Sequence, residues 1–137
     1  AAIFGFNLKL ACPQDYSPEG EILRRAQAKA PGRIELLQDP QAAIVGADVV
    51  NVDVWASMGQ EAEQKARLAH FNGYQLDDVL LAKADDKAIV LHCLPAHRGE
   101  EITEQVLEGP RNVVFDQAEN KMHLHKALLE HFILHKA

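Results

Sequence analysis

Side chains with reactive nitrogen or sulfur atoms follow a short apolar run in the second half of the chain. The run Ala88–Leu91 is long enough for a strand that is buried on both faces, and His92, Cys93 and His97 come after it. Pro95 interrupts regular strand pairing between them. A thiol, whose ordinary pKa is about 8.5, can accept or share a proton from a desolvated ammonium group. The segment predicts a ligand site at the carboxyl end of a strand or, alternatively, a structural strand-to-loop junction with Cys93 as a small buried side chain.

A second candidate group stands at the end of an earlier apolar run. Asp53 follows the predicted strand Asp48–Val52, and its carboxylate can hold an ammonium group through a charge-assisted hydrogen bond. Gly59 lies in the loop beyond it and gives that loop the backbone freedom to fold over a substrate. Trp55, in the same loop, is expected to pack rather than to contact a ligand. Because Asp is common in turns and helix caps, a purely structural role for Asp53 is the alternative.

The imidazoles and the thiol around Pro95 raise the question of a metal site. Zinc sites usually use pairs of ligands at recognised spacings, whereas Pro95 separates His92 and Cys93 from His97, and no second pair stands at such a spacing. We therefore predict no metal. The histidines near the carboxyl terminus are expected to be solvated on a terminal helix: His123, His125, His131 and His135.

The elements that must position these groups alternate between strands and helices. Apolar runs bounded by turn residues predict about five strands, at 7–11, 34–37, 48–52, 88–91 and 112–115. Alternation of strands and helices is typical of a Rossmann-like, doubly wound parallel sheet with right-handed crossovers. We therefore predict an α/β fold in which Asp53 and Cys93 lie at the carboxyl ends of neighbouring strands and face one crevice, with Ser57 in the loop above.

Cap residues and the spacing of apolar residues predict the helices. Ser17 as N-cap and Pro18 at the first helical position predict a helix to about Ala30. Further helices are predicted at 39–45, 61–71, 76–82 and 103–107. From about Glu119 one long helix is expected, with a buried stripe of Leu124, Ala127, Leu128 and Phe132.

Composition and charge restrict the class of protein. The chain has 137 residues, enough for one domain that buries about two thirds of its unfolded surface. Its 47% hydrophobic residues include no run that approaches the ~20 residues of a membrane span. The formal net charge of −6, without a basic tract, argues against nucleic-acid binding. Cys12 and Cys93 form neither a C-x-x-C pair nor a disulfide framework, which favours a reduced, cytoplasmic setting.

Three motifs together resemble those of one enzyme family. The segment His92–Pro95 has the sequence H-C-L-P, Asp53–Glu61 fits the pattern D-x-W-x-S-M-G-Q-E, and Phe115–Lys121 is similar to F-x-x-A-E-N-R. In this order they resemble the motifs of ornithine carbamoyltransferases, within the aspartate/ornithine carbamoyltransferase family. The resemblance covers nearly the whole chain but only the carboxyl-terminal, ornithine-binding half of the family's sequence. We therefore expect residues 1–137 to form an ornithine-binding domain.

The resemblance implies a carbamoyltransferase of arginine metabolism. Such an enzyme transfers the carbamoyl group of carbamoyl phosphate to the side-chain amine of L-ornithine, releases L-citrulline and phosphate, and needs no cofactor. Two alternatives stay open: a related acceptor such as putrescine or an acylated ornithine, and a non-catalytic binding fragment. A dinucleotide-binding oxidoreductase is not favoured, because the chain lacks a G-x-G-x-x-G turn.

The resemblance also implies roles for single residues. Asp53 and Ser57 are expected to hold the α-amino group of ornithine, and Met58 is expected to bind it through its backbone. Cys93 is expected to lie beside the reacting amine as the catalytic residue, where it also adjoins carbamoyl phosphate.

Two further residues are expected to contact carbamoyl phosphate. The carbonyl of Leu94 would touch the carbamoyl amide. Lys121 stands where the family pattern has Arg, so it keeps the positive charge but loses the planar group that forms two parallel hydrogen bonds.

The amino-terminal residues predict that the chain begins inside an element. Ala1–Phe6 is typical of the last turn of a helix, with Gly5 just after its end. The strand before that helix would lie in the middle of a doubly wound sheet, so we expect a sheet split at its centre and a chain that does not fold cooperatively alone. The family's carbamoyl-phosphate domain, with its Ser-Thr-Arg-Thr segment, does not occur in these residues, so the isolated chain is expected to be inactive. The family is commonly trimeric.

Overall fold

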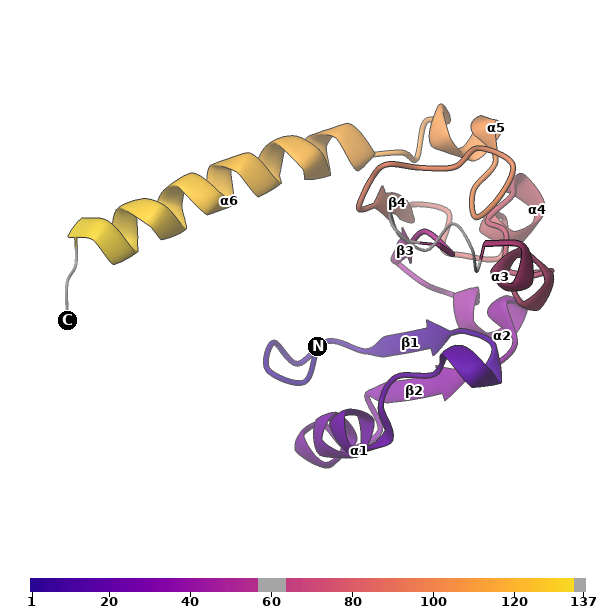
Figure 1. The fold of residues 1–137 in the computed structure, drawn as a ribbon, viewed down its shortest axis with the longest axis horizontal. Helices are drawn as coiled ribbons and strands as arrows, with labels where there is room; N and C mark the ends of the chain where they lie inside the picture. The colour runs from indigo at the N-terminus through magenta and orange to yellow at the C-terminus, as the bar shows by residue number, and fades with distance from the viewer. Residues whose placement is uncertain (57–63, 135–137) are drawn as a thin grey trace.

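The strands form two separate parallel pairs. The computed structural model describes residues 1–56 and 64–134. In it, β1 (Leu8–Ala11) pairs with β2 (Ile34–Leu37), and β3 (Val49–Val52) pairs with β4 (Ile89–His92). No ladder joins the two pairs within these residues, and Figure 1 shows them as distinct ribbons. The α/β class, the parallel pairing and the expected division of the sheet are therefore confirmed.

The predicted fifth strand, at 112–115, is wrong. Asn112 forms only an isolated bridge with Val90, and the Val113 N–H donates to the Val90 carbonyl at 3.1 Å. The strand stops there because the Asn112 side chain accepts the Val114 N–H at 2.8 Å and turns the backbone into a helix. The sheet edge beside β4 is consequently one bridge long, and the following helix begins at Val114.

The helices cover the strand pairs and carry side-chain caps at several starts. Asp39, Asp77 and Thr103 each accept a backbone N–H at the first turn of the helix that follows. The predicted first part of the third α-helix, from Glu61, lies outside the described residues. The helical segments are η1 (Gln14–Tyr16, a 3₁₀ turn), α1 (Gly20–Lys29), α2 (Pro40–Ile44), α3 (Gln64–His70), α4 (Asp78–Leu81), α5 (Glu104–Leu107) and α6 (Val114–Leu134).

The start of the first α-helix differs from the prediction, whereas the turn at the amino terminus matches it. The first α-helix begins at Gly20 rather than after Ser17, because the Ser17 hydroxyl donates backwards to the Gln14 carbonyl at 2.8 Å and closes η1. The amino-terminal turn is as predicted: the Gly5 N–H donates to the Ala1 carbonyl at 2.8 Å, and Gly5 has a φ of +77°.

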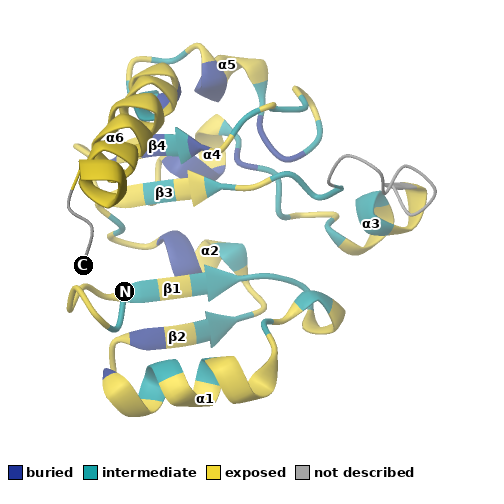
Figure 2. Cartoon of the chain, turned by 60° about the vertical axis from the view of Figure 1, so that its left-hand side comes forward, coloured by how far each residue is buried: buried dark blue, intermediate teal, exposed yellow. Residues whose placement is uncertain are grey.

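The core lies around the β3–β4 pair. Val90 on β4 is fully buried, and α4 and α5 contribute apolar side chains such as Leu80 and Val106. Ile102 and Val114 complete the same cluster at 0% exposure. Figure 2 shows buried residues gathered around β4, α4 and α5, whereas α1 is drawn partly intermediate and partly exposed and most of α6 is exposed. The carboxyl ends of β3 and β4 are thus held by the best-packed part of the domain.

The predicted buried stripe on the terminal helix is wrong. Leu124 is 59% exposed, Leu128 44% and Phe132 72%, and Ala127 is exposed as well. Only the start of α6 contacts β4, and Figure 1 shows the rest of the helix leading away from the strands. Every helix among the described residues is too short or too polar to cross a lipid bilayer.

Candidate functional site

The two principal candidate residues meet at one edge of the β3–β4 pair. The register places Val52 beside His92, so Asp53 and Cys93 are the next residues on adjacent parallel strands. The Cys93 thiol donates a hydrogen bond to Asp53 Oδ1 over 3.1 Å. Both residues are exposed at the surface of this edge. The predicted placement of this pair at the carboxyl ends of neighbouring parallel strands is confirmed. That the two residues face one crevice stays a prediction.

The environment of Cys93 makes the thiol a hydrogen-bond donor. Burial raises the pKa of the Cys93 thiol above its ordinary value, and the hydrogen bond to Asp53 and the charge of that carboxylate raise it further. The same Asp53 oxygen also accepts the Val54 N–H at 2.8 Å, which fixes the carboxylate on its loop. At neutral pH the site therefore offers a protonated thiol beside a carboxylate, a pair suited to receiving a cationic amine.

The chain turns sharply after Cys93. Leu94 has a φ of +53°, and the Leu94–Pro95 peptide bond is cis. The Leu94 N–H donates to His92 Nδ1 at 2.9 Å. Because Nδ1 of His92 accepts that hydrogen, the ring proton lies on the opposite nitrogen, Nε2. The histidine thus holds the backbone on which Cys93 and Leu94 are carried.

A buried carboxylate that the sequence did not indicate holds this histidine. Nε2 of His92 lies 3.1 Å from Glu101 Oε1, and both side chains are fully buried. The same oxygen of Glu101 accepts the His97 N–H at 2.6 Å. On the other side, the His92 N–H donates to Gln117 Oε1 of α6 at 2.9 Å. Sequence spacing gave no signal for Glu101 or Gln117, since both reach His92 only through the tertiary fold.

The two imidazoles and the thiol around Pro95 do not form one set of ligand atoms in the described structure. His92 is bound by Glu101, whereas Cys93 is bound by Asp53. His97 Nδ1 lies 3.6 Å from Glu101 Oε2, and these two buried atoms have no hydrogen-bond partner among the described residues. His97, Glu100 and Glu101 offer ligand atoms within 4.8 Å of one another, but Glu101 already serves His92 and the His97 backbone. The absence of a metal remains a prediction.

The structure locates only some of the other predicted site residues, and among the described ones it shows no side-chain hydrogen bond to Asp53 or Cys93. Ser57 and Met58 lie outside the described residues. Leu94 is half-buried in the turn after Cys93. Lys121 is exposed on α6, one helical turn beyond Gln117, which puts the two side chains on one face of the helix. Arg98 donates to Glu108 at 2.7 Å and so ties the loop after Cys93 to the end of α5.

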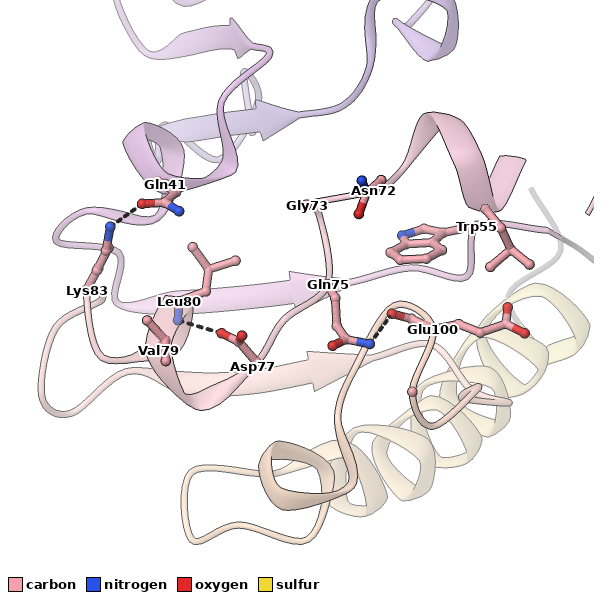
Figure 3. Close-up of a pocket in the computed structure, with 12 residues that line it drawn as sticks. Gln41, Trp55, Asn72, Gly73, Gln75, Asp77, Val79, Leu80, Lys83 and Glu100 are labelled. Atoms are coloured by element: carbon pink, nitrogen blue, oxygen red, sulfur yellow. Dashed lines mark hydrogen bonds between the residues drawn. The ribbon is translucent and has the colours of Figure 1, made fainter. Parts of the chain in front are cut away.

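A pocket of about 450 Å³ lies beside this edge, but neither Asp53 nor Cys93 lines it. Trp55 forms one side of the pocket in Figure 3, and the hydrogen bond from Gln75 to the Glu100 carbonyl borders it. The Trp55 ring also stacks on Phe71, with 5.6 Å between ring centres, which supports the packing role expected for Trp55. Because polar and apolar groups are mixed along this wall, the pocket itself does not specify a ligand.

Comparison with known proteins assigns the family. The profile of the aspartate/ornithine carbamoyltransferase Asp/Orn binding domain matches residues 1–132. The chain belongs to this family. It is 65% identical to an ornithine carbamoyltransferase of Desulfotalea psychrophila over 97% of this chain and 44% of that relative, and 57% identical to one of Geobacter sulfurreducens over 94% and 43%.

Solved structures agree with the sequence relatives. The ornithine carbamoyltransferase of Pyrococcus furiosus superposes with a TM-score of 0.87 and 43% identity over 94% of this chain and 42% of that chain. The chain therefore spans less than half the length of the relatives that it matches. This family membership makes the carboxyl edge of β3 and β4, where the recognised motifs meet, the region in which to look for substrate contacts.

Proposed function

We propose that residues 1–137 form the ornithine-binding domain of an ornithine carbamoyltransferase. The reaction joins L-ornithine and carbamoyl phosphate into L-citrulline and phosphate, as part of arginine metabolism. The observation that carries the proposal is the 3.1 Å contact between Cys93 and Asp53, which unites two of the recognised motifs at one sheet edge. The relatives named above bear the name of this activity, which supports the same assignment.

In the proposed reaction, ornithine binds as a cation and reacts as a neutral amine. Its side-chain ammonium has an ordinary pKa near that of Lys, about 10.4, so a proton must leave before attack. The nitrogen lone pair then forms a bond to the carbamoyl carbon, the bond from that carbon to the phosphate oxygen breaks, and phosphate leaves with the electron pair. The proton lost before attack passes to solvent, and the second proton, which the new bond leaves on the nitrogen, passes to the departing phosphate. The chain's contribution is to orient the amine and to stabilise it in the attacking position.

In this proposal, Asp53 and Cys93 bind different amino groups of ornithine. The Asp53 carboxylate, with Ser57 and the Met58 backbone, holds the α-amino end of ornithine. Cys93 lies beside the reacting nitrogen and exchanges its hydrogen bond with Asp53 for one with the substrate. Its raised pKa keeps the thiol protonated, so a second negative charge does not develop beside Asp53.

Leu94 and Lys121 are the proposed contacts to carbamoyl phosphate. The Leu94 carbonyl is positioned through the hydrogen bond from its own N–H to His92, which Glu101 holds in turn. Lys121 supplies a positive charge but lacks the planar guanidinium with which Arg forms two parallel hydrogen bonds. Because Lys121 and Gln117 share a face of α6, the helix can bring that charge toward the loop after β4.

The remaining parts of the proposed enzyme come from outside these residues. A carbamoyl-phosphate domain must supply the phosphate-binding groups, since the chain matches only 44% of the Desulfotalea relative. We propose no cofactor, a cytoplasmic location and a trimer or a multiple of it. Nucleic acid and membranes are not proposed as partners.

A chimaeric protein tests the proposal. The part of the Desulfotalea relative that this chain does not match is placed ahead of Ala1, and we call the product the joined enzyme. It should form citrulline from carbamoyl phosphate and ornithine, whereas the 137-residue chain alone should not. Putrescine and N-acetylornithine, assayed in parallel, should react far more slowly. A preference for either would replace ornithine as the acceptor, and no product with any amine would refute the proposed transferase.

A further inference from the structure

A group of aromatic rings surrounds the chain where it leaves β3. Tyr16 of η1 packs on Phe71 with 4.8 Å between ring centres, and Phe71 stacks on Trp55 at 5.6 Å. Tyr74 meets Phe71 edge-on at 5.7 Å. Arg67 of α3 lies with its guanidinium carbon 5.2 Å from the centre of the Tyr16 ring. These residues are half-buried and lie outside the main apolar core.

Arg67 connects this group to the backbone near the site. Its Nη1 donates to the Trp55 carbonyl at 3.1 Å, and Trp55 is two residues beyond Asp53. The guanidinium is held from the other side by the face of the Tyr16 ring. The planar group thus helps to fix the backbone that leaves Asp53, through contacts that include the hydrogen bond to the Trp55 carbonyl and the Tyr16 ring.

Tyr16 belongs to a part of the molecule whose strands, among the described residues, do not pair with β3 or β4. It follows β1, in the other strand pair, and its hydroxyl shares a hydrogen bond of 3.0 Å with Nδ1 of His70 at the end of α3. Within the described residues the β1–β2 and β3–β4 pairs are not joined by strand pairing. Tyr16 and Arg67 therefore link the two pairs at the same edge at which Asp53 lies.

We propose that Arg67 and Tyr16 are positioning residues for ornithine, acting through the Trp55 carbonyl on the backbone that carries Asp53. This inference rests on the proposed function. Neither side chain needs to touch the substrate, and neither enters the chemistry of carbamoyl transfer. Their loss loosens the backbone on which the Asp53 carboxylate is carried, so the carboxylate meets the α-amino group less well, which weakens ornithine binding more than the chemical step.

Substitutions at Arg67 in the joined enzyme test the hydrogen bond. Arg67→Gln should raise the KM for ornithine about tenfold, the loss expected for one hydrogen bond from a charged group. The kcat and the KM for carbamoyl phosphate should stay within about twofold, since these depend on other residues. Arg67→Lys keeps the charge and a donor but not the planar face, so it should raise the KM for ornithine only about threefold.

Substitutions at Tyr16 test the ring contact. Tyr16→Phe keeps the face under the guanidinium and should behave like the unchanged enzyme, whereas Tyr16→Leu should raise the KM for ornithine about threefold. The matched control is Arg24→Gln, since Arg24 is 73% exposed and forms an ion pair with Glu21 within α1. It should leave all constants unchanged.

The outcomes separate this inference from the proposed function. If Arg67→Gln does not fold, Tyr16→Leu carries the test, because it removes the ring beneath the guanidinium and leaves Arg67 in place, and Tyr16→Phe controls for the lost hydrogen bond to His70. Two results would overturn the positioning role while leaving the transferase intact. One is an unchanged KM for ornithine in the folded variants. The other is a fall in kcat together with equal rises in the KM for ornithine and the KM for carbamoyl phosphate. A joined enzyme that forms no citrulline with unchanged Arg67 and Tyr16 would overturn the proposed function, and this inference with it.

Discussion

The contact between Cys93 and Asp53 narrows the role expected for the thiol. From the sequence, Cys93 was a group that could accept or share a proton from an ammonium. The structure shows it donating to Asp53, and burial together with that carboxylate raises the pKa of the Cys93 thiol. Deprotonation would place a thiolate beside a carboxylate, so the protonated thiol is the resting form.

The resting state of Cys93 predicts how its reactivity depends on pH. Alkylation by iodoacetamide requires the thiolate, so the rate at Cys93 should stay low at neutral pH and rise only as pH approaches the raised pKa. Asp53→Asn in the joined enzyme should move the midpoint of that rise to lower pH, because it removes the negative charge. Mass spectrometry of the peptide that contains Cys93 measures the rate. An unchanged midpoint in Asp53→Asn would show that the carboxylate does not act on the thiol.

The same contact predicts the kinetic effect of removing sulfur. Cys93→Ser in the joined enzyme should lower kcat on the order of 10²-fold, because the shorter hydroxyl holds the reacting amine less well in the attacking position. The KM for ornithine should change much less, because Asp53 and the loop beyond it hold the α-amino end. Steady-state kinetics measure both constants, and Cys12→Ser provides the matched control. A rise in KM with unchanged kcat would assign Cys93 to binding instead.

At the scale of elements, the loop from His92 to Glu101 behaves as one unit. Glu101 accepts hydrogen bonds from the His92 ring and the His97 N–H, and His92 accepts the Leu94 N–H. A charged residue that is fully buried is stabilised only when such partners are present. The position of Cys93 thus depends on a carboxylate that makes no contact with Cys93 in the described structure.

This dependence predicts a stability effect at Glu101. Glu101→Gln in the joined enzyme should cost about 1–3 kcal/mol, because a neutral amide oxygen accepts the hydrogen bonds from the His92 ring and the His97 N–H more weakly than the carboxylate oxygen Oε1 does. Thermal unfolding measures the change. Glu104→Gln, at a side chain that is 72% exposed, should stay within about 0.5 kcal/mol. Equal small effects for both variants would mean that the buried pair contributes little.

Elements with a local signal could be predicted, and those decided by distant contacts could not. The strands at β1 to β4 and the caps Asp39 and Thr103 follow from apolar runs and cap residues. The pairing of Asp53 with Cys93 follows in turn from strand order. One local signal was missed: the fifth strand was prevented by the Asn112 side chain, which bonds two residues ahead, within a run that is otherwise apolar. The roles of Glu101 and Arg67 depend on hydrogen bonds to residues nine and twelve positions away. Periodicity on α6 predicted an apolar stripe but not whether anything covers it.

At the scale of the whole molecule, the described residues hold one good core and two weak regions. The core surrounds β4, whereas the β1–β2 pair has no ladder to β3–β4. Beyond its first turns, α6 carries Leu124, Leu128 and Phe132 at 59%, 44% and 72% exposure. Apolar area that stays in water does not stabilise the fold, whereas its burial would contribute about 25 cal/mol per Å².

These weak regions predict the behaviour of the 137-residue chain in solution. A domain holds only ~5–15 kcal/mol in total, and each unpaired backbone group out of water costs ~1–3 kcal/mol, so a divided sheet leaves little margin. We expect a broad thermal transition and strong binding of a hydrophobic dye such as ANS, because the strand pairs and α6 do not unfold as one unit with the core. The joined enzyme should instead melt sharply and bind little dye, since the added domain covers apolar surface and orders the edges. A single sharp transition from a monomer of the chain alone would show that the β3–β4 core is enough to hold both strand pairs and the terminal helix together.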